Sequence, residues 1–147
     1  MAQTFKWLAG EGAINALTTQ LDALASAAFS AASAAIDNTV GLYPWMDLEV
    51  NLASLTPGAG SPYIAVWLNL SLDGTNYEKV PDASSGDKPP NAIFPLEASV
   101  AQASRVTISD IPIPPLKFKL CLRNVSGIAL AATGNTLQYN RHYAQGV

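Results

Sequence analysis

The sequence predicts an all-β protein, a single domain of 147 residues folded as a jelly-roll-like antiparallel β-sandwich of about seven or eight strands. Apolar residues recur at every second position in several stretches, which places them on one face of an extended strand. Turns rich in Gly, Pro and Asn separate those stretches at spacings of about ten residues. No stretch alternates strand with helix, so a βαβ protein is excluded.

The clearest strand covers residues 63–72, YIAVWLNLSL. Its even-numbered positions are all aliphatic, which predicts a half-buried strand with Tyr63 and Trp67 on the outer face. Asp73-Gly74 predicts the turn that ends it, because glycine accepts a positive φ and aspartate caps its own turn.

Residues 45–54 alternate in the same way, with Trp45, Asp47 and Glu49 on the outer face. The Gly/Pro loop at residues 57–62 then has about the length of a longer hairpin connection. We therefore predict that the two strands pair antiparallel.

The N-terminal quarter is less regular. Residues 1–12 predict a short edge strand or an arm. Leucines at helical spacing and abundant alanine predict a short helical turn over residues 17–24, followed by a strand of small residues that ends at Ile36. A single helix over residues 15–36 is the alternative.

The second half contains further short strands separated by turns. Residues 80–91 form a polar surface loop by composition, and the Pro-rich run 111–115 must be extended but cannot lie inside a sheet. Pro95 places its segment at a sheet edge. The predicted extended segments are 93–96, 105–111, 117–123 with Cys121 outward, 128–132, and 136–143.

Composition excludes several classes of protein. Eight Lys and Arg stand against eleven Asp and Glu with no basic run, so the charge pattern of a nucleic-acid-binding protein is missing. Cys121 is the only cysteine, which excludes an intramolecular disulfide and a cysteine-rich zinc site. No stretch has the apolar length of a signal peptide or membrane span, so we expect a protein made in a cytoplasm that binds no membrane.

Few residues offer catalytic chemistry. Asp47 and Glu49 lie two apart on one strand face, a spacing compatible with a glycosidase carboxylate pair, but a solvated strand face is the simpler interpretation. His142 is the only histidine and no G-x-S-x-G motif supplies a serine nucleophile, so we expect this histidine at the surface. We predict no enzymatic activity, no cofactor and no metal site.

Large aromatic residues at outward positions are unusual for a protein that stays monomeric. Trp45, Tyr63 and Trp67 occupy outer faces, where such residues usually contact a second layer, a ligand or another subunit. Cover by the loop at residues 80–91 and a subunit contact are two open interpretations, and stacking against a carbohydrate is a third.

Three motifs together resemble one family of proteins. They are SLDGTNY at residues 71–77, IPIPP at residues 111–115 and GNTL at residues 134–137. They resemble motifs of small β-sandwich virion proteins of tailed bacteriophages, and the similarity extends over residues 40–143. This resemblance implies a structural component of the particle and supplies no catalytic residues.

The resemblance implies a virion protein that is assembled in the host cytoplasm. We expect a homo-oligomer, with a trimer as the expected form, that decorates or cements the capsid by binding the major capsid protein. A tail, baseplate or neck component bound to a tail protein is one alternative, and a carbohydrate-binding module for host attachment is another. The candidate contacts lie in two arms, residues 1–12 and 138–147, and on the aromatic face: Phe5, Trp7, Trp45, Tyr63, Trp67, Tyr139 and Tyr143.

Overall fold

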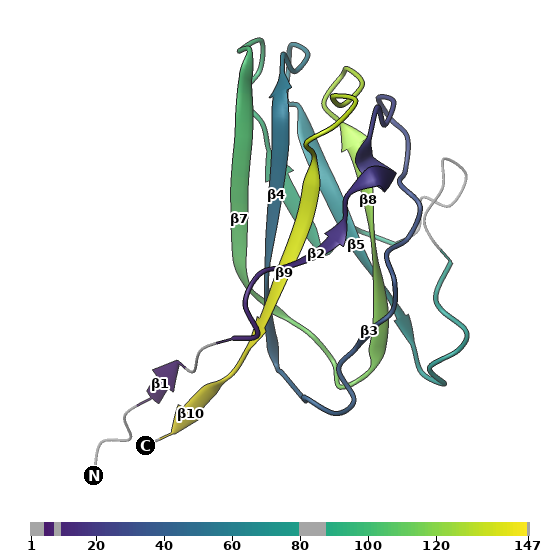
Figure 1. The fold of residues 1–147 in the computed structure, drawn as a ribbon, viewed down its shortest axis with the longest axis vertical. Coiled ribbons are helices and arrows are strands. Elements are labelled where there is room, and N and C mark those ends of the chain that lie inside the picture. Colours follow the sequence, from purple (N-terminus) through teal and green to yellow (C-terminus); the bar gives the residue numbers. More distant parts are fainter. Residues whose placement is uncertain (1–4, 8–9, 80–87, 147) are drawn as a thin grey trace.

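The computed structural model describes residues 5–7, 10–79 and 88–146, with the backbone alone for residues 5–7 and 144–146 (Figure 1). Within these residues no helix is long and apolar enough to cross a membrane. The described elements are β1 (Phe5–Trp7), β2 (Ile14–Leu17), the 3-10 helix η1 (Thr19–Leu21), β3 (Ile36–Asp37), β4 (Trp45–Leu55), β5 (Tyr63–Ser71), β6 (Ala92–Pro95), β7 (Gln102–Pro112), β8 (Lys117–Val125), β9 (Thr136–His142) and β10 (Ala144–Gly146).

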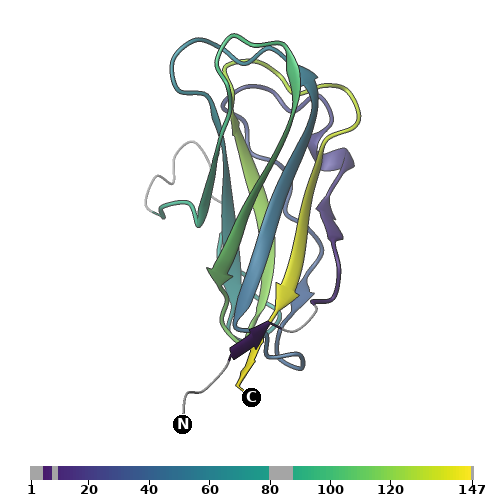
Figure 2. The ribbon, with the colours of Figure 1, turned by 90° about the vertical axis from the view of Figure 1, so that its left-hand side faces the viewer.

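Eight of these strands form two four-stranded antiparallel sheets, in the orders β2-β9-β4-β7 and β3-β8-β5-β6. Figure 2 shows the sheets as two layers seen from the side. Each sheet takes strands from both halves of the chain, and the eight strands have the order of a jelly roll. The predicted antiparallel β-sandwich is thus confirmed, but β4 and β5 lie in different sheets and do not pair as a hairpin.

The core lies between the two sheets and is built from the alternate aliphatic positions. Along β4, buried and partly exposed residues alternate almost without interruption, as expected for a strand with one wet face. Each fully buried aliphatic side chain contributes about 1.5–3 kcal/mol of hydrophobic stabilisation. Residues that are at most 2% exposed here include Met46, Leu48, Val50, Leu52, Ile64, Val66, Leu68, Phe94, Phe118, Leu120, Leu122 and Leu137.

The outer face of β5 is buried, so the prediction of a half-buried strand is wrong. Ala65, Trp67, Asn69 and Ser71 point away from the main core, yet each is at most 6% exposed. The Trp67 ring lies 5.4 Å from the Phe29 ring, and its Nε1 donates a hydrogen bond to the backbone oxygen of Lys88 at 2.9 Å. Segments far from β5 in the sequence therefore cover this sheet.

The small-residue segment at residues 25–35 lies along the edge of β8, in line with β3. It forms one isolated bridge, Phe29 to Arg123, and becomes regular only at β3, so the predicted strand is mostly irregular. Every third residue of the segment meets every second residue of β8: Ala27 N bonds Asn124 O, Ser30 N bonds Leu122 O, Ser33 N bonds Leu120 O, and Ile36 pairs with Phe118.

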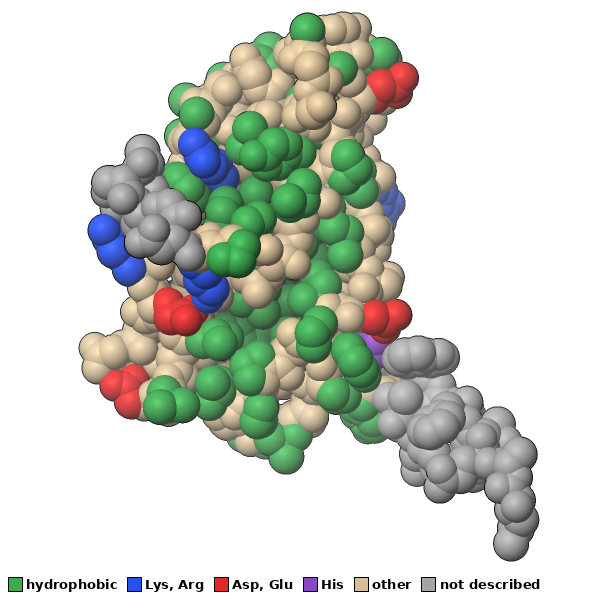
Figure 3. Space-filling model, turned by 180° about the vertical axis from the view of Figure 1, so that it is seen from behind, with side chains coloured by type: hydrophobic (Ala, Val, Ile, Leu, Met, Phe, Trp, Pro, Cys, Tyr) green, Lys and Arg blue, Asp and Glu red, His purple; other side chains and the backbone are tan. Residues whose placement is uncertain are grey.

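Serine side chains complete this three-to-two pairing. The backbone N–H groups of Leu122 and Leu120 donate to the Oγ atoms of Ser30 and Ser33 at 3.0 and 2.9 Å. Each buried N–H therefore has an acceptor, although the segment cannot form a standard ladder. Seen from behind, this side of the molecule shows many hydrophobic side chains near its middle and few charged ones (Figure 3).

Of two further predictions, the one for the helical turn is confirmed and the one for a strand over residues 128–132 is wrong. The helical turn predicted over residues 17–24 corresponds to η1, and the alternative long helix over 15–36 is wrong. The strand predicted over residues 128–132 is also wrong, because asparagine side chains hold this loop. Asn124 Nδ2 donates to Ile128 O at 2.8 Å, and Asn135 Nδ2 donates to Ala131 O at 2.7 Å, so carbonyls that a strand would pair are already bonded.

The two ends of the chain meet outside the sandwich. β1 and β10 pair antiparallel as a separate two-stranded ribbon, which projects from one end of the molecule (Figure 1). Residues 138–142, predicted as part of a C-terminal arm, lie instead within the sheet as part of β9.

Candidate functional site

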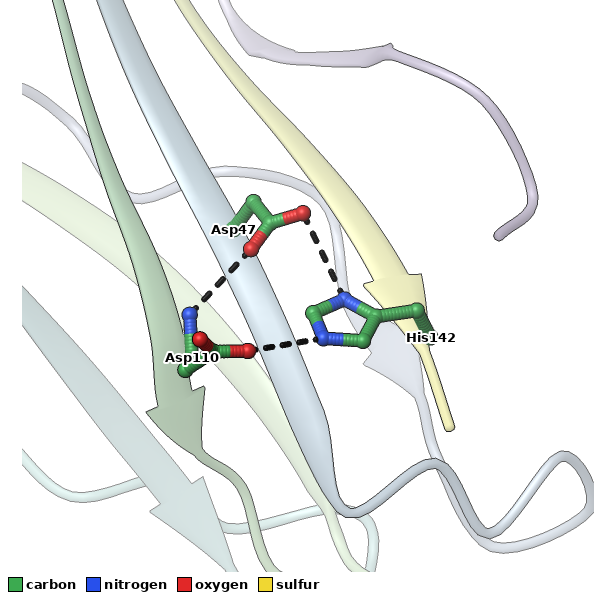
Figure 4. A group of neighbouring side chains, drawn as sticks. All are labelled: Asp47, Asp110 and His142. Atoms are coloured by element: carbon green, nitrogen blue, oxygen red, sulfur yellow. Dashed lines mark hydrogen bonds and ion pairs between the residues drawn. The ribbon is translucent and has the colours of Figure 1, made fainter. Parts of the chain in front are cut away.

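Three polar side chains from three neighbouring strands meet on the outer face of the β2-β9-β4-β7 sheet (Figure 4). They are Asp47 on β4, Asp110 on β7 and His142 on β9. The ring of His142 lies between the two carboxylates: Nε2 is 3.1 Å from Asp110 Oδ1, and Nδ1 is 3.4 Å from Asp47 Oδ2. We call these three residues the Asp-Asp-His cluster.

A bulge in β7 brings Asp110 into the cluster. Met46 pairs with Ile111 and Leu48 with Ile108, so three steps on β7 oppose two on β4. Asp110 sits in the extra step with a φ of 60°, in the left-handed region that aspartate tolerates better than most residues. Bulges of this kind re-aim a side chain, and here the carboxylate turns toward β9.

His142 is 7% exposed, which corrects the prediction that it lies at the surface. The strand β9 extends far enough to carry it beside β4, where it is paired with Trp45. A neutral imidazole has one N–H group and can donate to one acceptor at a time. Because both ring nitrogens face carboxylates, both contacts are attractive only when the cluster holds additional positive charge.

The carboxylate of Asp47 is fixed from two further directions. Its Oδ1 accepts a hydrogen bond from the backbone N–H of Asp110 at 3.2 Å, and its Oδ2 accepts one from Asn140 Nδ2 at 3.4 Å. Asn140 Oδ1 in turn accepts the backbone N–H of Gly12 at 3.0 Å. The cluster is therefore connected to the segment that leads to the projecting ribbon.

A hollow of about 200 Å³ lies next to the cluster and shares Asp47 with it. Glu49 and Arg105, which both line it, form an ion pair at 2.9 Å, and Thr107 Oγ1 donates to the other Glu49 oxygen at 3.0 Å. The hydrogen bond from Arg105 holds the pKa of Glu49 below its ordinary value. Further residues that line the hollow are Gln138 and Asn140.

The glycosidase interpretation of Asp47 and Glu49 finds no support in this geometry. Glycoside hydrolysis needs one carboxylic acid whose pKa is raised so that it can protonate the leaving group. Glu49 has the opposite environment, because Arg105 and Thr107 stabilise its ionised form. Glu49 therefore belongs to a cross-strand polar contact with Arg105 and Thr107, and it does not form an acid–base pair with Asp47.

The aromatic residues predicted as contacts do not form one surface. Trp45 lies half-buried on β4, whereas Tyr63 and Trp67 lie on β5 in the other sheet, in a small cluster with Phe29 and Cys121. The carbohydrate platform proposed from those three aromatics is therefore absent. Cys121, predicted outward, is fully buried there, and burial raises the pKa of its thiol.

The remaining predicted contacts differ in exposure. Tyr139 packs against the main core at 9% exposure, and burial raises the pKa of its hydroxyl. Tyr143 is 41% exposed and lies 5.6 Å from the Tyr43 ring. The side chains of Phe5 and Trp7 lie outside the described part of the structure.

One partly buried ion pair has no counterpart in the sequence analysis. Arg141 binds both carboxylate oxygens of Glu11, at 2.6 and 2.7 Å, and also donates to the backbone oxygen of Asp37. Nothing local in the sequence predicts a contact between residues 130 positions apart.

The sequence does contain a signal for the bulge at Asp110. The inward residues Val106, Ile108 and Ile111 change their spacing from two to three, which is typical of a bulge.

No family model, curated protein or solved structure matches the chain. The similarity to virion proteins of tailed bacteriophages therefore stays a prediction from sequence motifs.

Proposed function

We propose that the chain is a non-enzymatic structural subunit of a tailed-phage particle. In this proposal it forms a homo-oligomer, expected to be a trimer, and decorates or cements the capsid lattice. The observation that carries the proposal is the ribbon of β1 and β10, which stands outside the sandwich (Figure 1).

An isolated two-stranded ribbon is marginally stable in water. Its two outer edges also present unpaired backbone N–H and C=O groups, which favour the addition of another strand. β7 offers a suitable acceptor, because this strand of 11 residues has β4 as its only paired neighbour among the described strands. A ribbon of one subunit that adds to an edge of the next would satisfy both sets of groups.

Exposed apolar residues lie at the same end of the molecule as the ribbon. Val40 is 86% exposed and Leu42 is 60% exposed, in the loop that joins β3 to β4 (Figure 1). Tyr43 of this loop contacts Tyr143, the residue just before β10. Exposed apolar groups beside a projecting strand pair are typical of a contact between subunits.

The fold and charge are compatible with this role. Jelly rolls include the domains of viral capsids, although a fold alone does not define a function and lectin domains share it. The net charge of −3 suits the outside of a particle better than contact with packaged DNA. Assembly would stabilise the particle by adding buried interface to the lattice.

Sedimentation velocity of the full chain tests the oligomer. We expect a homo-oligomer, and we expect the paired change Val40→Ser with Leu42→Asn to shift it toward monomer. Asn suits position 42, whose φ is 50°. Ile128→Ser is the matched control, because this exposed residue lies in the loop after β8, at the opposite end of the sandwich (Figure 1).

Co-sedimentation with purified phage heads and tails tests the partner. Binding to heads supports the decoration or cement role, and binding to tails alone moves the assignment to the tail, baseplate or neck. A protein that remains monomeric and binds neither would overturn the proposal.

A further inference from the structure

The geometry points to a divalent metal-ion site formed by Asp47, Asp110 and His142, and we propose that it binds a first-row transition ion of the Zn²⁺ type. One ligand atom from each residue lies within 4.8 Å of the others. Ligands around Zn²⁺ at about 2.0–2.2 Å lie about 3.3–3.6 Å from one another in a tetrahedron. The two carboxylates face different ring nitrogens of His142, so the imidazole must turn to present one nitrogen to an ion between them, and the Asp110 side chain, which is 55% exposed, has room to follow.

The charges of the cluster favour a cation. Two carboxylates flank one imidazole, and within the described residues neither Asp47 nor Asp110 forms an ion pair with Lys or Arg. The nearest strand neighbours that carry a guanidinium use it elsewhere: Arg105 pairs with Glu49, and Arg141 pairs with Glu11. A divalent ion would supply the positive charge that makes both carboxylates attractive to the same centre.

Both carboxylates are oriented toward His142 before any ion arrives. The bulge in β7 turns Asp110 toward His142, and Asn140 together with a backbone N–H group orients Asp47. Partners that orient a ligand in this way are a common part of protein metal sites. The hollow reaches Asp47 and the Asp110 side chain is 55% exposed, so water molecules would complete the coordination from the side of the two carboxylates.

The ligand set selects the class of ion. Imidazole with carboxylates suits Zn²⁺ and its first-row neighbours, whereas Ca²⁺ and Mg²⁺ prefer oxygen ligands alone. Such an ion would join β4, β7 and β9 at the end of the sheet from which the chain continues into β10. The site would therefore stiffen the base of the projecting ribbon, whatever the ribbon binds.

The first experiment uses the untagged full chain after treatment with a chelator. Titration calorimetry with ZnCl₂ should show one ion per chain, and the melting temperature should rise by roughly 5–10 °C when Zn²⁺ is present at about a hundred times its dissociation constant. CaCl₂ and MgCl₂ should leave the melting temperature unchanged. Because His142 is the only histidine, its imidazole NMR signals need no assignment and should shift with Zn²⁺ alone.

Two variants and one control locate the ion. Asp110→Asn keeps a residue that tolerates a positive φ, and His142→Gln keeps a polar side chain of similar length. Each should weaken Zn²⁺ binding by at least about 100-fold, since even residues that only orient a ligand cost about 10–100-fold. Glu97→Gln, which removes an exposed carboxylate bonded to Gln102, should bind as the wild type does.

Two results would overturn the site. Imidazole signals that do not respond to Zn²⁺ in the wild-type chain would exclude His142 as a ligand, and this result needs no variant. Equal Zn²⁺ affinity in the wild type, Asp110→Asn and His142→Gln would show that the ion binds surface carboxylates elsewhere.

Discussion

The outer faces of the two sheets differ in their exposure to solvent. On the β2-β9-β4-β7 sheet the outer face is open and polar, and it carries the Asp-Asp-His cluster and the adjacent hollow. On the β3-β8-β5-β6 sheet the outer face of β5 is buried, and the Phe29 ring and the backbone oxygen of Lys88 contact Trp67 there. The first face presents polar side chains to solvent, whereas the second buries a small apolar cluster around Trp67.

The outward residues of the central strands explain the difference. On β4 they include Asp47 and Glu49, whose charges are costly to bury without partners. On β5 they are Ala65, Trp67 and Asn69, which carry no charge. A neutral face with one large aromatic gains free energy when another segment covers it. Both strands alternate in sequence, so alternation alone does not reveal whether the second face is wet.

Of the changes that test this difference, Trp67→Ala should have the largest effect on stability. It should lower the free energy of unfolding by about 3–5 kcal/mol, because it leaves a cavity in the covered layer and deprives Lys88 O of its donor. Trp45→Ala on the open face is the matched change and should cost only about 1 kcal/mol. Urea denaturation measures both values.

Cys121 gives an independent test of the same cover. A thiol reagent should label it slowly in the native wild type, where it is fully buried, and faster in Trp67→Ala than in Trp45→Ala. Equal losses of stability together with equal labelling rates would mean that no covering layer persists in solution.

The serine contacts at the edge of β8 should have the next largest effect on stability. Ser30→Ala and Ser33→Ala each remove the acceptor of a buried backbone N–H on β8, so each should cost about 1–3 kcal/mol. Ser26→Ala is the control, because Ser26 is exposed in the same segment, and it should change stability by less than about 0.5 kcal/mol. Three similar values in urea denaturation would contradict the three-to-two pairing.

Glu49→Gln should have the smallest effect and the clearest pH dependence. At pH 7 the change should cost at most about 1 kcal/mol, since Arg105, the partner of Glu49 in the ion pair, is largely exposed to solvent. The folded pKa of Glu49 lies below its ordinary value near 4.5, so its contribution is present above that value and is lost as the pH falls through the folded pKa.

Denaturation at pH 7, 5 and 3 measures this dependence. The difference between wild type and Glu49→Gln should be constant from pH 7 to 5 and shrink toward pH 3. The difference between wild type and Ser30→Ala should stay constant over the same range, because no titrating group takes part in that contact. A loss at Glu49 that persists at pH 3 would show that the charge of its carboxylate is not what stabilises the fold.

Prediction from sequence succeeded where the signal was local. The strands around residues 45–54, 63–72 and 117–123, the edge position of Pro95 and the short helical turn near Leu21 all follow from spacing and composition. It failed where distant segments supply the missing partner, as for the burial of Trp67 and the loop at residues 128–132.

The sequence predicted only part of the candidate site. The sequence predicts Asp47 as an outward carboxylate, but it places His142 at the surface and does not bring Asp110 to the same site. Their meeting depends on the register of β4 with both β7 and β9, and on a bulge of one residue. A shift of one residue in either pairing would point these side chains to the opposite face.

The sequence by itself determined that this chain is a β-sandwich, because period-two burial and turn residues act over a few neighbouring positions. The tertiary structure alone decided which outer face is covered and which polar residues meet. Those outcomes depend on strand order and register, which are set by contacts between distant segments, such as that of Ser30 with Leu122, 92 positions apart.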